Sequence, residues 1–260
     1  MTPLTELQAE DDHALARALA DLAGARLVAV RAGLSAQGVD GKALKDAGDA
    51  ASQEVLAGAL REVAPGDAVL SEEAADDPAR LDAQRVWIID PLDGTREFSE
   101  VPRDDWAVHV ALWEGGELVA GAVALPGRGV TYSTGERHRS ALPERPVDSP
   151  FRLAVSRSRP PEFAGRLADS MGATTVPMGS AGVKAMSVVD GSSDAYVHAG
   201  GQYEWDSAAP AVVAAAYGLH VSRIDGSPLR YNQENPWLPD LVICRPEFAD
   251  PLLRALGMEE

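Results

Sequence analysis

The sequence predicts a mixed α/β protein, with an α+β first lobe followed by an α/β second lobe. Two patterns favour this class. The first part of the chain has long stretches with helical spacing of apolar residues and then a set of short β-rich runs, whereas the last part alternates strand-like and helical segments. The 260 residues are enough for one large domain or for two smaller ones, each with its own core.

Two helices are expected before any strand. Residues 5–34 repeat leucine and valine near helical spacing, and residues 47–63 do the same until Pro65-Gly66 ends the segment. Five β-rich runs follow, at 68–70, 86–89, 106–112, 118–125 and 129–132. The last three of these runs are typical of successive strands in an antiparallel sheet.

A stretch rich in proline and charge, residues 137–150, is the candidate boundary between the two lobes. It divides the chain into a first lobe at 1–140 and a second lobe at 141–260. Beyond it, each strand-like run is followed by a helical segment, which is typical of an α/β arrangement. The strands are expected at 153–155, 174–176 and 195–198, and the helices at 161–171, 180–189 and 206–217.

The composition excludes several classes of protein. The net charge of −17 and the pI of about 4.6 would repel a nucleic-acid backbone. The single cysteine, Cys244, cannot form an intrachain disulfide and is expected to be a buried apolar residue of a strand. The first residues do not have the pattern of a signal peptide, and no apolar run approaches the ~18 residues needed to span a bilayer. We therefore expect a soluble protein of the reducing cytoplasm.

Two carboxylates, Asp90 and Asp93, stand three residues apart directly after an apolar β-run. Residues 90–95 read Asp-Pro-Leu-Asp-Gly-Thr, in which proline sharpens the turn and glycine keeps the following backbone open. The preceding β-run also ends in acid, and adjacent strands that end at one edge would bring Glu72 beside Asp90. Close carboxylates repel each other unless they are protonated or bound to metal, and Mg²⁺ prefers several oxygen ligands. The pattern favours a magnesium site over an acidic turn that only caps a helix.

Residues 90–95 resemble the signature of the inositol monophosphatase superfamily, which includes fructose-1,6-bisphosphatases and 3′-phosphoadenosine 5′-phosphate (PAP) phosphatases. Residues 205–209, Trp-Asp-Ser-Ala-Ala, are similar to the W-D-x-A-A/G motif of the same superfamily, and the resemblance covers nearly the whole chain. It implies a layered αβαβα sandwich. It also implies a Mg²⁺-dependent phosphomonoesterase that uses two or three ions and is inhibited by lithium.

The resemblance implies a role for each acidic residue of the two motifs. Glu72, Asp90 and the Leu92 carbonyl would bind a first metal ion. Asp90, Asp93 and Asp206 would bind a second, and Glu72 would help to place a third through water. The first lobe would thus carry most of the metal ligands, and the second would supply Asp206. Without the resemblance, Asp206 reads as the N-cap of the helix that follows it.

The same resemblance implies which residues handle water and phosphate. Thr95 would orient the attacking water, and Asp49 would accept a hydrogen bond from that threonine, although Asp46 stands where the family often has a threonine. The backbone N–H groups of Gly94 and Thr95 would hold phosphate oxygens. One metal ion would activate the water and another would stabilise the leaving oxygen.

Three stretches are closer to the PAP phosphatase branch than to inositol monophosphatases. They are residues 96–98, which read Arg-Glu-Phe, residues 156–158 and residues 226–231. In addition, Ala199 stands where inositol monophosphatases have the glutamate that recognises inositol hydroxyls. Loss of that carboxylate leaves room for a larger group.

Three polar residues of the second lobe are candidate substrate contacts. Arg157, Ser180 and Lys184 could meet a second phosphate or a ribose. The alternative for Arg157 and Lys184 is solvated surface charge, and the alternative for Ser180 is a helix N-cap. His109 alternates with valines on a predicted strand, so we expect a surface or hydrogen-bonded histidine and assign no histidine to catalysis. Trp205 is expected to serve packing.

The sequence therefore favours a 3′(2′),5′-bisphosphate nucleotidase that hydrolyses PAP to AMP and phosphate. An inositol monophosphatase or fructose-1,6-bisphosphatase of broad specificity is the alternative within the same class. A catalytically silent binding protein on this fold is the alternative from another class. The expected partner is a small phosphate ester and neither a nucleic-acid polymer nor a membrane, and a homodimer is left open.

Overall fold

The structure is a computed structural model that describes residues 11–136, 142–146, 148–158, 160–161 and 163–257. The chain begins with two long helices, α2 (Asp12–Ala36) and α3 (Gly41–Val63). Residues 5–10 of the predicted first helix lie outside the described part. Asp11 is the N-cap of α2, because its side chain accepts a hydrogen bond from the Ala14 N–H at 2.7 Å. The second helix starts six residues before its predicted beginning.

The first sheet contains five strands in the order of the sequence. They are β1 (Ala68–Ser71), β2 (Arg85–Asp93), β3 (Ala107–Glu114), β4 (Glu117–Leu125) and β5 (Val130–Ser133). β1 is parallel to β2, and the other neighbours are antiparallel as predicted. Alternate residues of β2 face opposite layers: Trp87 and Ile89 pack against α2 and α3, whereas Val86 and Ile88 pack on the other side.

The second sheet also has five strands, but their order is β7-β6-β8-β10-β9. β6 is parallel to β7 and β8, whereas β10 is antiparallel to β8 and β9. These strands are β6 (Phe151–Ser156), β7 (Ala173–Met178), β8 (Ala195–Tyr203), β9 (His220–Ser222) and β10 (Trp237–Cys244). The helices that accompany them are α5 (Phe163–Met171), α6 (Ala181–Val189), α7 (Glu204–Ala216) and α8 (Ala249–Gly257).

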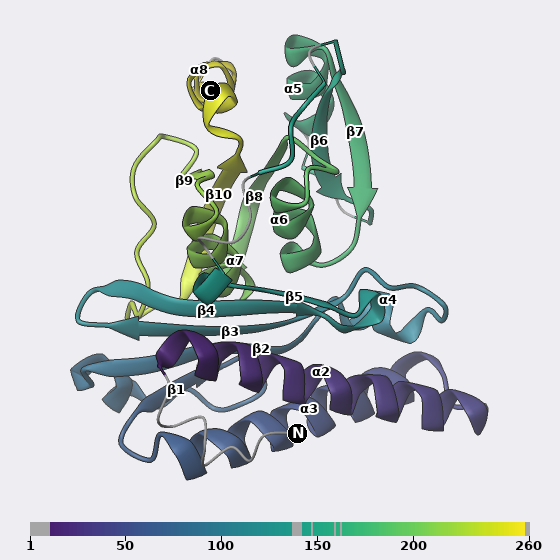
Figure 1. Cartoon of the computed structure of the whole chain (residues 1–260), viewed down its shortest axis with the longest axis vertical. Coiled ribbons are helices and arrows are strands. Elements are labelled where there is room, and N and C mark those ends of the chain that lie inside the picture. Colours follow the sequence, from purple (N-terminus) through teal and green to yellow (C-terminus); the bar gives the residue numbers. More distant parts are fainter. Residues whose placement is uncertain (1–10, 137–141, 147, 159, 162, 258–260) are drawn as a thin grey trace.

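Five layers result from this order, and Figure 1 shows them stacked from α2 and α3 to α5 and α8. One core lies between α2, α3 and the first sheet. A second core joins both sheets through α6 and α7, and a third lies between the second sheet, α5 and α8. This layering confirms the predicted αβαβα class. The division into lobes at residue 140 stays a prediction, because the proposed boundary lies partly outside the described residues.

Short elements complete the chain. α4 (Thr95–Ser99) follows the acidic turn after β2, and four 3₁₀ turns occur at Pro78–Asp82, Pro126–Arg128, Thr134–Glu136 and Pro246–Phe248. Cys244 is buried at the end of β10, as predicted. Within the described residues, none of the helices has the length and apolar character needed to cross a membrane.

Candidate metal and phosphate site

A bulge in β2 places both aspartates of the acidic turn on one face of the sheet. In a regular strand, residues three apart point to opposite faces. Here Asp90 pairs with His109 and Asp93 pairs with Ala107, so two residues of β2 stand opposite one residue of β3. Pro91 lies in the bulge, where no ladder hydrogen bond is needed from its nitrogen. Both carboxylates therefore face the layer that contains α6 and α7.

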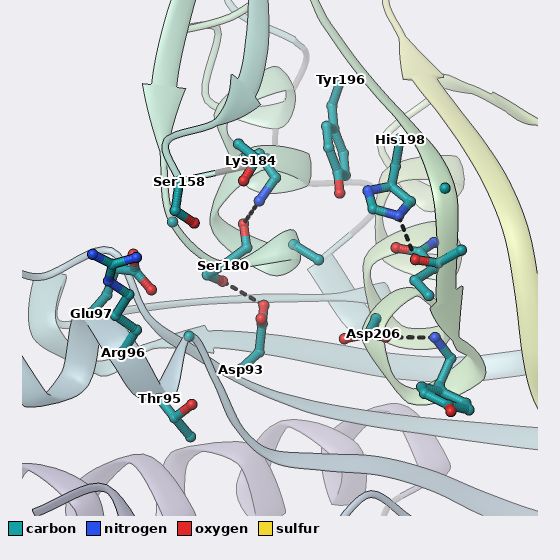
Figure 2. Close-up of a pocket in the computed structure, with 18 of the residues that line it drawn as sticks. Asp93, Thr95, Arg96, Glu97, Ser158, Ser180, Lys184, Tyr196, His198 and Asp206 are labelled. Carbon is teal, nitrogen blue, oxygen red and sulfur yellow. Dashed lines mark hydrogen bonds between the residues drawn. The ribbon is translucent and has the colours of Figure 1, made fainter. Parts of the chain in front are cut away.

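A third aspartate reaches the same place from the second half of the chain. Asp90, Asp93 and Asp206 each offer an oxygen within 4.8 Å of the others. Asp206 is the third residue of α7 and not its N-cap, which corrects the interpretation from sequence. Its Oδ2 accepts a hydrogen bond from the Tyr203 N–H at 2.6 Å. Figure 2 shows Asp93 and Asp206 on opposite sides of one space.

Asp90 is the member of this cluster with the fewest hydrogen bonds relative to its burial. It is 1% exposed, its Oδ1 accepts a hydrogen bond from the Leu92 N–H at 3.0 Å, and its Oδ2 has no hydrogen-bond partner among the described residues. Burial raises the pKa of Asp90 well above its ordinary value, and the charges of Glu72, Asp93 and Asp206 raise it further. A buried carboxylate oxygen without a partner is costly, so this atom is available for a cation.

The two neighbouring acids are also pushed toward their neutral forms. Burial of the carboxylate and then the charge of Asp206 raise the pKa of Glu72 to about 7, although much of the Glu72 residue is exposed in the loop after β1. Burial and then the charge of Asp93 raise the pKa of Asp206 to about 6. Several carboxylates that repel one another around an unpaired oxygen fit a hard divalent cation.

Asp93 differs because the protein itself supplies donors to one of its oxygens. Asp93 Oδ2 accepts hydrogen bonds from the Ser180 hydroxyl at 2.5 Å and from the Gly182 N–H at 2.8 Å, and His109 Nε2 lies 3.1 Å away. Burial is the largest single influence on the pKa of Asp93 and raises it, but the charge and hydrogen bond of His109, the charge of Lys184 and the Ser180 hydroxyl together lower it by more, so the net direction is downward. The other oxygen, Oδ1, is left for a ligand.

His109 was not expected at this site. It is fully buried, and its Nδ1 lies 3.1 Å from the Trp205 carbonyl oxygen, which can only accept a hydrogen bond. Nδ1 therefore carries a proton. Nε2 faces Asp93, although the contact is poorly directed for an N–H···O bond. Burial by itself would lower the pKa of His109, but the charge of Asp93 helps to raise it. A side chain at Gly182 would place its Cβ 2.2 Å from Nε2. The surface alternative for this histidine was wrong, whereas a hydrogen-bonded histidine was correct.

The turn at residues 90–95 packs against α3. Gly94 has φ +87°, a conformation that favours glycine, and Thr95 begins α4. The Ser52 hydroxyl donates to the Pro91 carbonyl at 2.6 Å, and Gly48 leaves room for Leu92. This contact fixes the turn against the first helical layer.

Asp49 lies next to Gly48 on the same helix. Burial, and then the charges of Glu73 and Asp46, raise the pKa of Asp49 to about 7. In the described part of the chain no hydrogen bond joins it to Thr95. Its predicted contact with that threonine therefore stays a prediction.

A pocket of about 690 Å³ opens above the acidic cluster. The residues named from sequence that line it come from both halves of the chain: Asp93, Gly94, Thr95, Arg96, Glu97, Ser156, Ser158, Ser180, Lys184, Ala199 and Asp206. Ser180 is also the N-cap of α6, and its φ of +55° is unusual for a residue other than glycine. Both predicted roles of Ser180 are thus compatible.

Lys184 is a largely buried residue in the wall of this pocket. Its Nζ donates to the Ser180 carbonyl at 2.5 Å and lies 5.2 Å from the centre of the Tyr196 ring (Figure 2). Burial lowers the pKa of Lys184, partly opposed by the charge of Asp93. The alternative of solvated surface charge was wrong for this lysine.

Two other candidates from sequence lie elsewhere. Arg157 is not among the residues that line the pocket, although its neighbours Ser156 and Ser158 are. Its Nη2 donates to Glu97 Oε1 at 2.6 Å and to Glu100 Oε2 at 2.9 Å. The 226–231 segment also lies outside the lining. Its last residue, Tyr231, is buried in the core between the sheets.

Several lining residues gave no signal in the sequence analysis. They belong mainly to β8 and to the start of β10: Tyr196, His198, Gly200, Gly201, Gln202, Tyr203 and Trp237. The consecutive glycines that follow the predicted strand at 195–198 are the one pattern that marks a bulge or a close approach.

A comparison with protein-family models shows that residues 12–255 match the inositol monophosphatase family. The chain belongs to the inositol monophosphatase family. Among similar proteins, the 3′-phosphoadenosine 5′-phosphate phosphatase of Mycobacterium leprae is 52% identical over 95% of this chain and 94% of the relative. The 3′(2′),5′-bisphosphate nucleotidase CysQ of Escherichia coli is 33% identical over 74% of this chain and 81% of the relative.

Solved structures agree with the family assignment. The crystal structure of CysQ from Bacteroides thetaiotaomicron, a bacterial member of the inositol monophosphatase family, has a TM-score of 0.72 and 25% identity. The match covers 88% of this chain and 95% of that one. In this inositol monophosphatase family member, the acidic cluster and the pocket therefore occupy a fold that is shared with phosphatases.

Proposed function

We propose that this chain is a Mg²⁺-dependent phosphatase that hydrolyses PAP to AMP and phosphate. The observation that carries the proposal is the buried, unpaired Oδ2 of Asp90 within a cluster of aspartates at the floor of a pocket. The reaction is proposed from the similarity to a PAP phosphatase and to a 3′(2′),5′-bisphosphate nucleotidase. The Arg-Glu-Phe sequence at 96–98 and Ala199 favour the nucleotidase over an inositol phosphatase.

Divalent cations would be held by the side chains of Asp90, Asp93 and Asp206, assisted by Glu72 and by the Leu92 carbonyl. When bound, such ions lower the pKa of water and stabilise a departing alkoxide oxygen. The identity of the metal as Mg²⁺ and the use of two or three ions are parts of the proposal. Carboxylate oxygens and the absence of sulfur ligands in this cluster of described residues support a hard cation.

The chain's own residues would bind and orient the ester. The N–H groups of Gly94 and Thr95 would hold phosphate oxygens at the start of α4, and the Thr95 hydroxyl would orient the attacking water. Asp49 would accept the hydrogen bond from Thr95. Lys184 is close enough to the pocket to add positive charge to its wall, although its Nζ already donates to Ser180.

Arg157 is a weaker candidate for a substrate contact. Its guanidinium group already pairs with Glu97 and Glu100, so a second phosphate would have to compete with two carboxylates. The proposal therefore depends on Gly94, Thr95, Ser180 and Lys184 for the phosphate-bearing part of the substrate.

The test is a comparison of kcat/KM for PAP, inositol-1-phosphate and fructose-1,6-bisphosphate, with Mg²⁺ and with EDTA. We expect Mg²⁺-dependent release of phosphate and at least a ~10-fold preference for PAP over inositol-1-phosphate, about 1.4 kcal/mol of transition-state binding. Ala199→Glu should shift the ratio toward inositol-1-phosphate, and Ala216→Glu is a control helix substitution away from the pocket lining. Equal rates for the two esters would reject the nucleotidase, and no release from any ester would favour a silent binding protein.

Two further parts of the proposal concern the setting of the enzyme. A single buried cysteine suits the cytoplasm, and this location stays a prediction. The partner is a small phosphate ester, and a homodimer remains an open prediction.

A further inference from the structure

The part of the pocket formed by β8 and β10 is aromatic and uncharged. Trp237 is 48% exposed and Tyr203 is 46% exposed, and both line the pocket. The other lining residues of these strands carry no carboxylate, ammonium or guanidinium group, and burial lowers the pKa of His198. This composition contrasts with the acidic cluster and Lys184, where phosphate and metal would lie.

A second bulge exposes bare backbone beside these rings. Ala199 pairs with Asp240 and Gln202 pairs with Leu238, so Gly200 and Gly201 stand opposite the single residue Pro239. Both glycines have φ near +90° or above, which other residues rarely adopt. Bulges of this kind are frequent beside active sites, where they redirect side chains.

The bulge also positions the indole ring of Trp237. A Cβ at Gly201 would lie 2.3 Å from Trp237 Nε1 and 2.6 Å from Cε2, so the indole packs directly against glycine backbone. Tyr203 is already stacked on Trp205, with ring centres 4.7 Å apart and planes at 11°. Trp237 has no such ring partner among the described residues, and about half of its surface is open.

One polar group in this wall also has no partner. Gln202 is 7% exposed and lines the pocket, and its Nε2 is buried without a hydrogen bond in the described part of the chain. A buried amide nitrogen of this kind is expensive unless a ligand or water accepts its hydrogen bond. An aromatic face and an amide donor together suit a flat, heteroaromatic ligand that has ring nitrogens as acceptors.

We propose that Trp237 and Gln202 form the base-binding part of the site, in which the purine of a nucleotide substrate stacks on the indole. The Gln202 Nε2 donates to a ring nitrogen of that base. This inference rests on the proposed function, because it assigns the nucleoside end of the same substrate. The ribose then lies between the uncharged wall and the acidic cluster.

The first test compares Trp237→Ala, Trp237→Phe and Trp113→Phe, the last being a control on β3 outside the pocket lining. Stacking of a base on an aromatic ring changes affinity by about tenfold. For PAP, Trp237→Ala should raise KM by about tenfold while kcat stays within about twofold. For inositol-1-phosphate, which has no base, it should leave both constants unchanged. Trp237→Phe and Trp113→Phe should resemble the wild type.

The second test measures binding of AMP by tryptophan fluorescence and does not depend on the Trp237→Ala variant folding. The chain has five tryptophans. AMP should change the emission of the wild type and of Trp113→Phe, and this change should largely disappear in Trp237→Phe although AMP still binds by calorimetry. Gln202→Leu should weaken AMP binding severalfold.

The outcomes separate this inference from the proposed function. If the wild type prefers PAP but Trp237→Ala leaves its KM unchanged, or Trp237→Phe keeps the fluorescence change, the base site is wrong and the nucleotidase stands. An equal loss for PAP and inositol-1-phosphate would show that the indole contacts a sugar or supports the pocket, and would also overturn the base site. If the wild type does not prefer PAP, the proposed function itself fails.

Discussion

Two buried aspartates, Asp194 directly before β8 and Asp90 in β2, have opposite surroundings in the fold. Asp194 is 0% exposed, accepts a hydrogen bond from the Arg152 N–H at 2.8 Å, and pairs with the guanidinium groups of Arg152 and Arg145 at 3.1 and 3.3 Å. Asp90 is equally buried, but three carboxylates surround it, and its Oδ2 has no hydrogen bond within the described residues because His109 Nδ1 is 3.9 Å away.

The difference separates a structural carboxylate from a functional one. A buried charge is retained in a protein only when it is paired, hydrogen-bonded or bound to a metal. The chain supplies the partners of Asp194, whereas under the proposed function the partner of Asp90 Oδ2 is a bound cation. The comparison therefore predicts opposite effects of the same substitution at the two positions.

The largest effect is expected for Asp90→Asn. This substitution removes the charge that would bind metal, so kcat/KM for PAP should fall at least ~1,000-fold. It also removes a repulsive buried charge, so the free energy of unfolding in EDTA should not decrease. The measurements are phosphate release and urea denaturation. A folded Asp90→Asn protein with near-normal turnover would remove Asp90 from the metal site.

The matched substitution Asp194→Asn should change stability and not catalysis. It removes the anionic partner of Arg145 and Arg152, whose side chains are partly exposed, and it weakens the hydrogen bonds at the fully buried position 194. We expect a loss of about 3 kcal/mol in the free energy of unfolding. The kcat/KM of the folded fraction should stay within about twofold of the wild type. If urea denaturation shows no loss of stability, the two aspartates do not differ as described.

A smaller effect is expected at His109, which acts on Asp93 and does not reach the pocket lining. His109→Ala should loosen the orientation of Asp93 and raise the Mg²⁺ concentration for half-maximal activity by about tenfold. At saturating Mg²⁺, kcat should recover most of its value. His220→Ala on β9 is the matched control, because that histidine bonds Ser222 far from the acidic turn in sequence and sheet order. Equal Mg²⁺ dependence in both variants would contradict the role of His109.

The smallest predicted effect is a pH dependence of stabilisation by Mg²⁺. The pKa values of Glu72 and Asp206 are raised to about 7 and about 6, so the metal-free fold binds more protons than the unfolded chain between about pH 4 and pH 7. The stability that these protons provide is therefore present at low pH and lost as pH rises through 7. Mg²⁺ competes with the protons, so its effect on Tm should grow by a few degrees from pH 5 to pH 8. A constant shift in thermal scans would contradict the assignment.

Sequence patterns were sufficient for most helices and strands and for Asp90 and Asp93, whereas the layers and the role of Asp206 came from the family resemblance. The β-rich runs predicted all five strands of the first sheet, with approximate bounds. The motifs at 90–95 and 205–209 identified three aspartates that the fold brings together. The bulge at Pro91-Leu92 was not predicted, although a proline inside a strand is consistent with a bulge. That bulge is the reason why Asp90 and Asp93 face the same layer.

Other features depend on tertiary contacts that a local pattern cannot show. His109 was expected either on a surface or hydrogen-bonded, because its strand alternates. The surface alternative fails because β3 is covered on both faces, and the largely apolar sequence of β3 was the missed signal. Arg157 meets Glu97 and Glu100 only because β6 lies next to α4 in space. Trp237 and Gln202 become neighbours of the pocket through the pairing of β8 with β10.

Calorimetric titration of Mg²⁺ at pH 7.5 into the wild type, Asp90→Asn and Asp194→Asn tests the central claim most directly. It measures metal binding without relying on any substrate, at a temperature where all three proteins are folded. The account predicts binding by the wild type and by Asp194→Asn, and a loss of at least ~10-fold in affinity for Asp90→Asn. Equal binding by the wild type and Asp90→Asn, or a greater loss in Asp194→Asn, would contradict it.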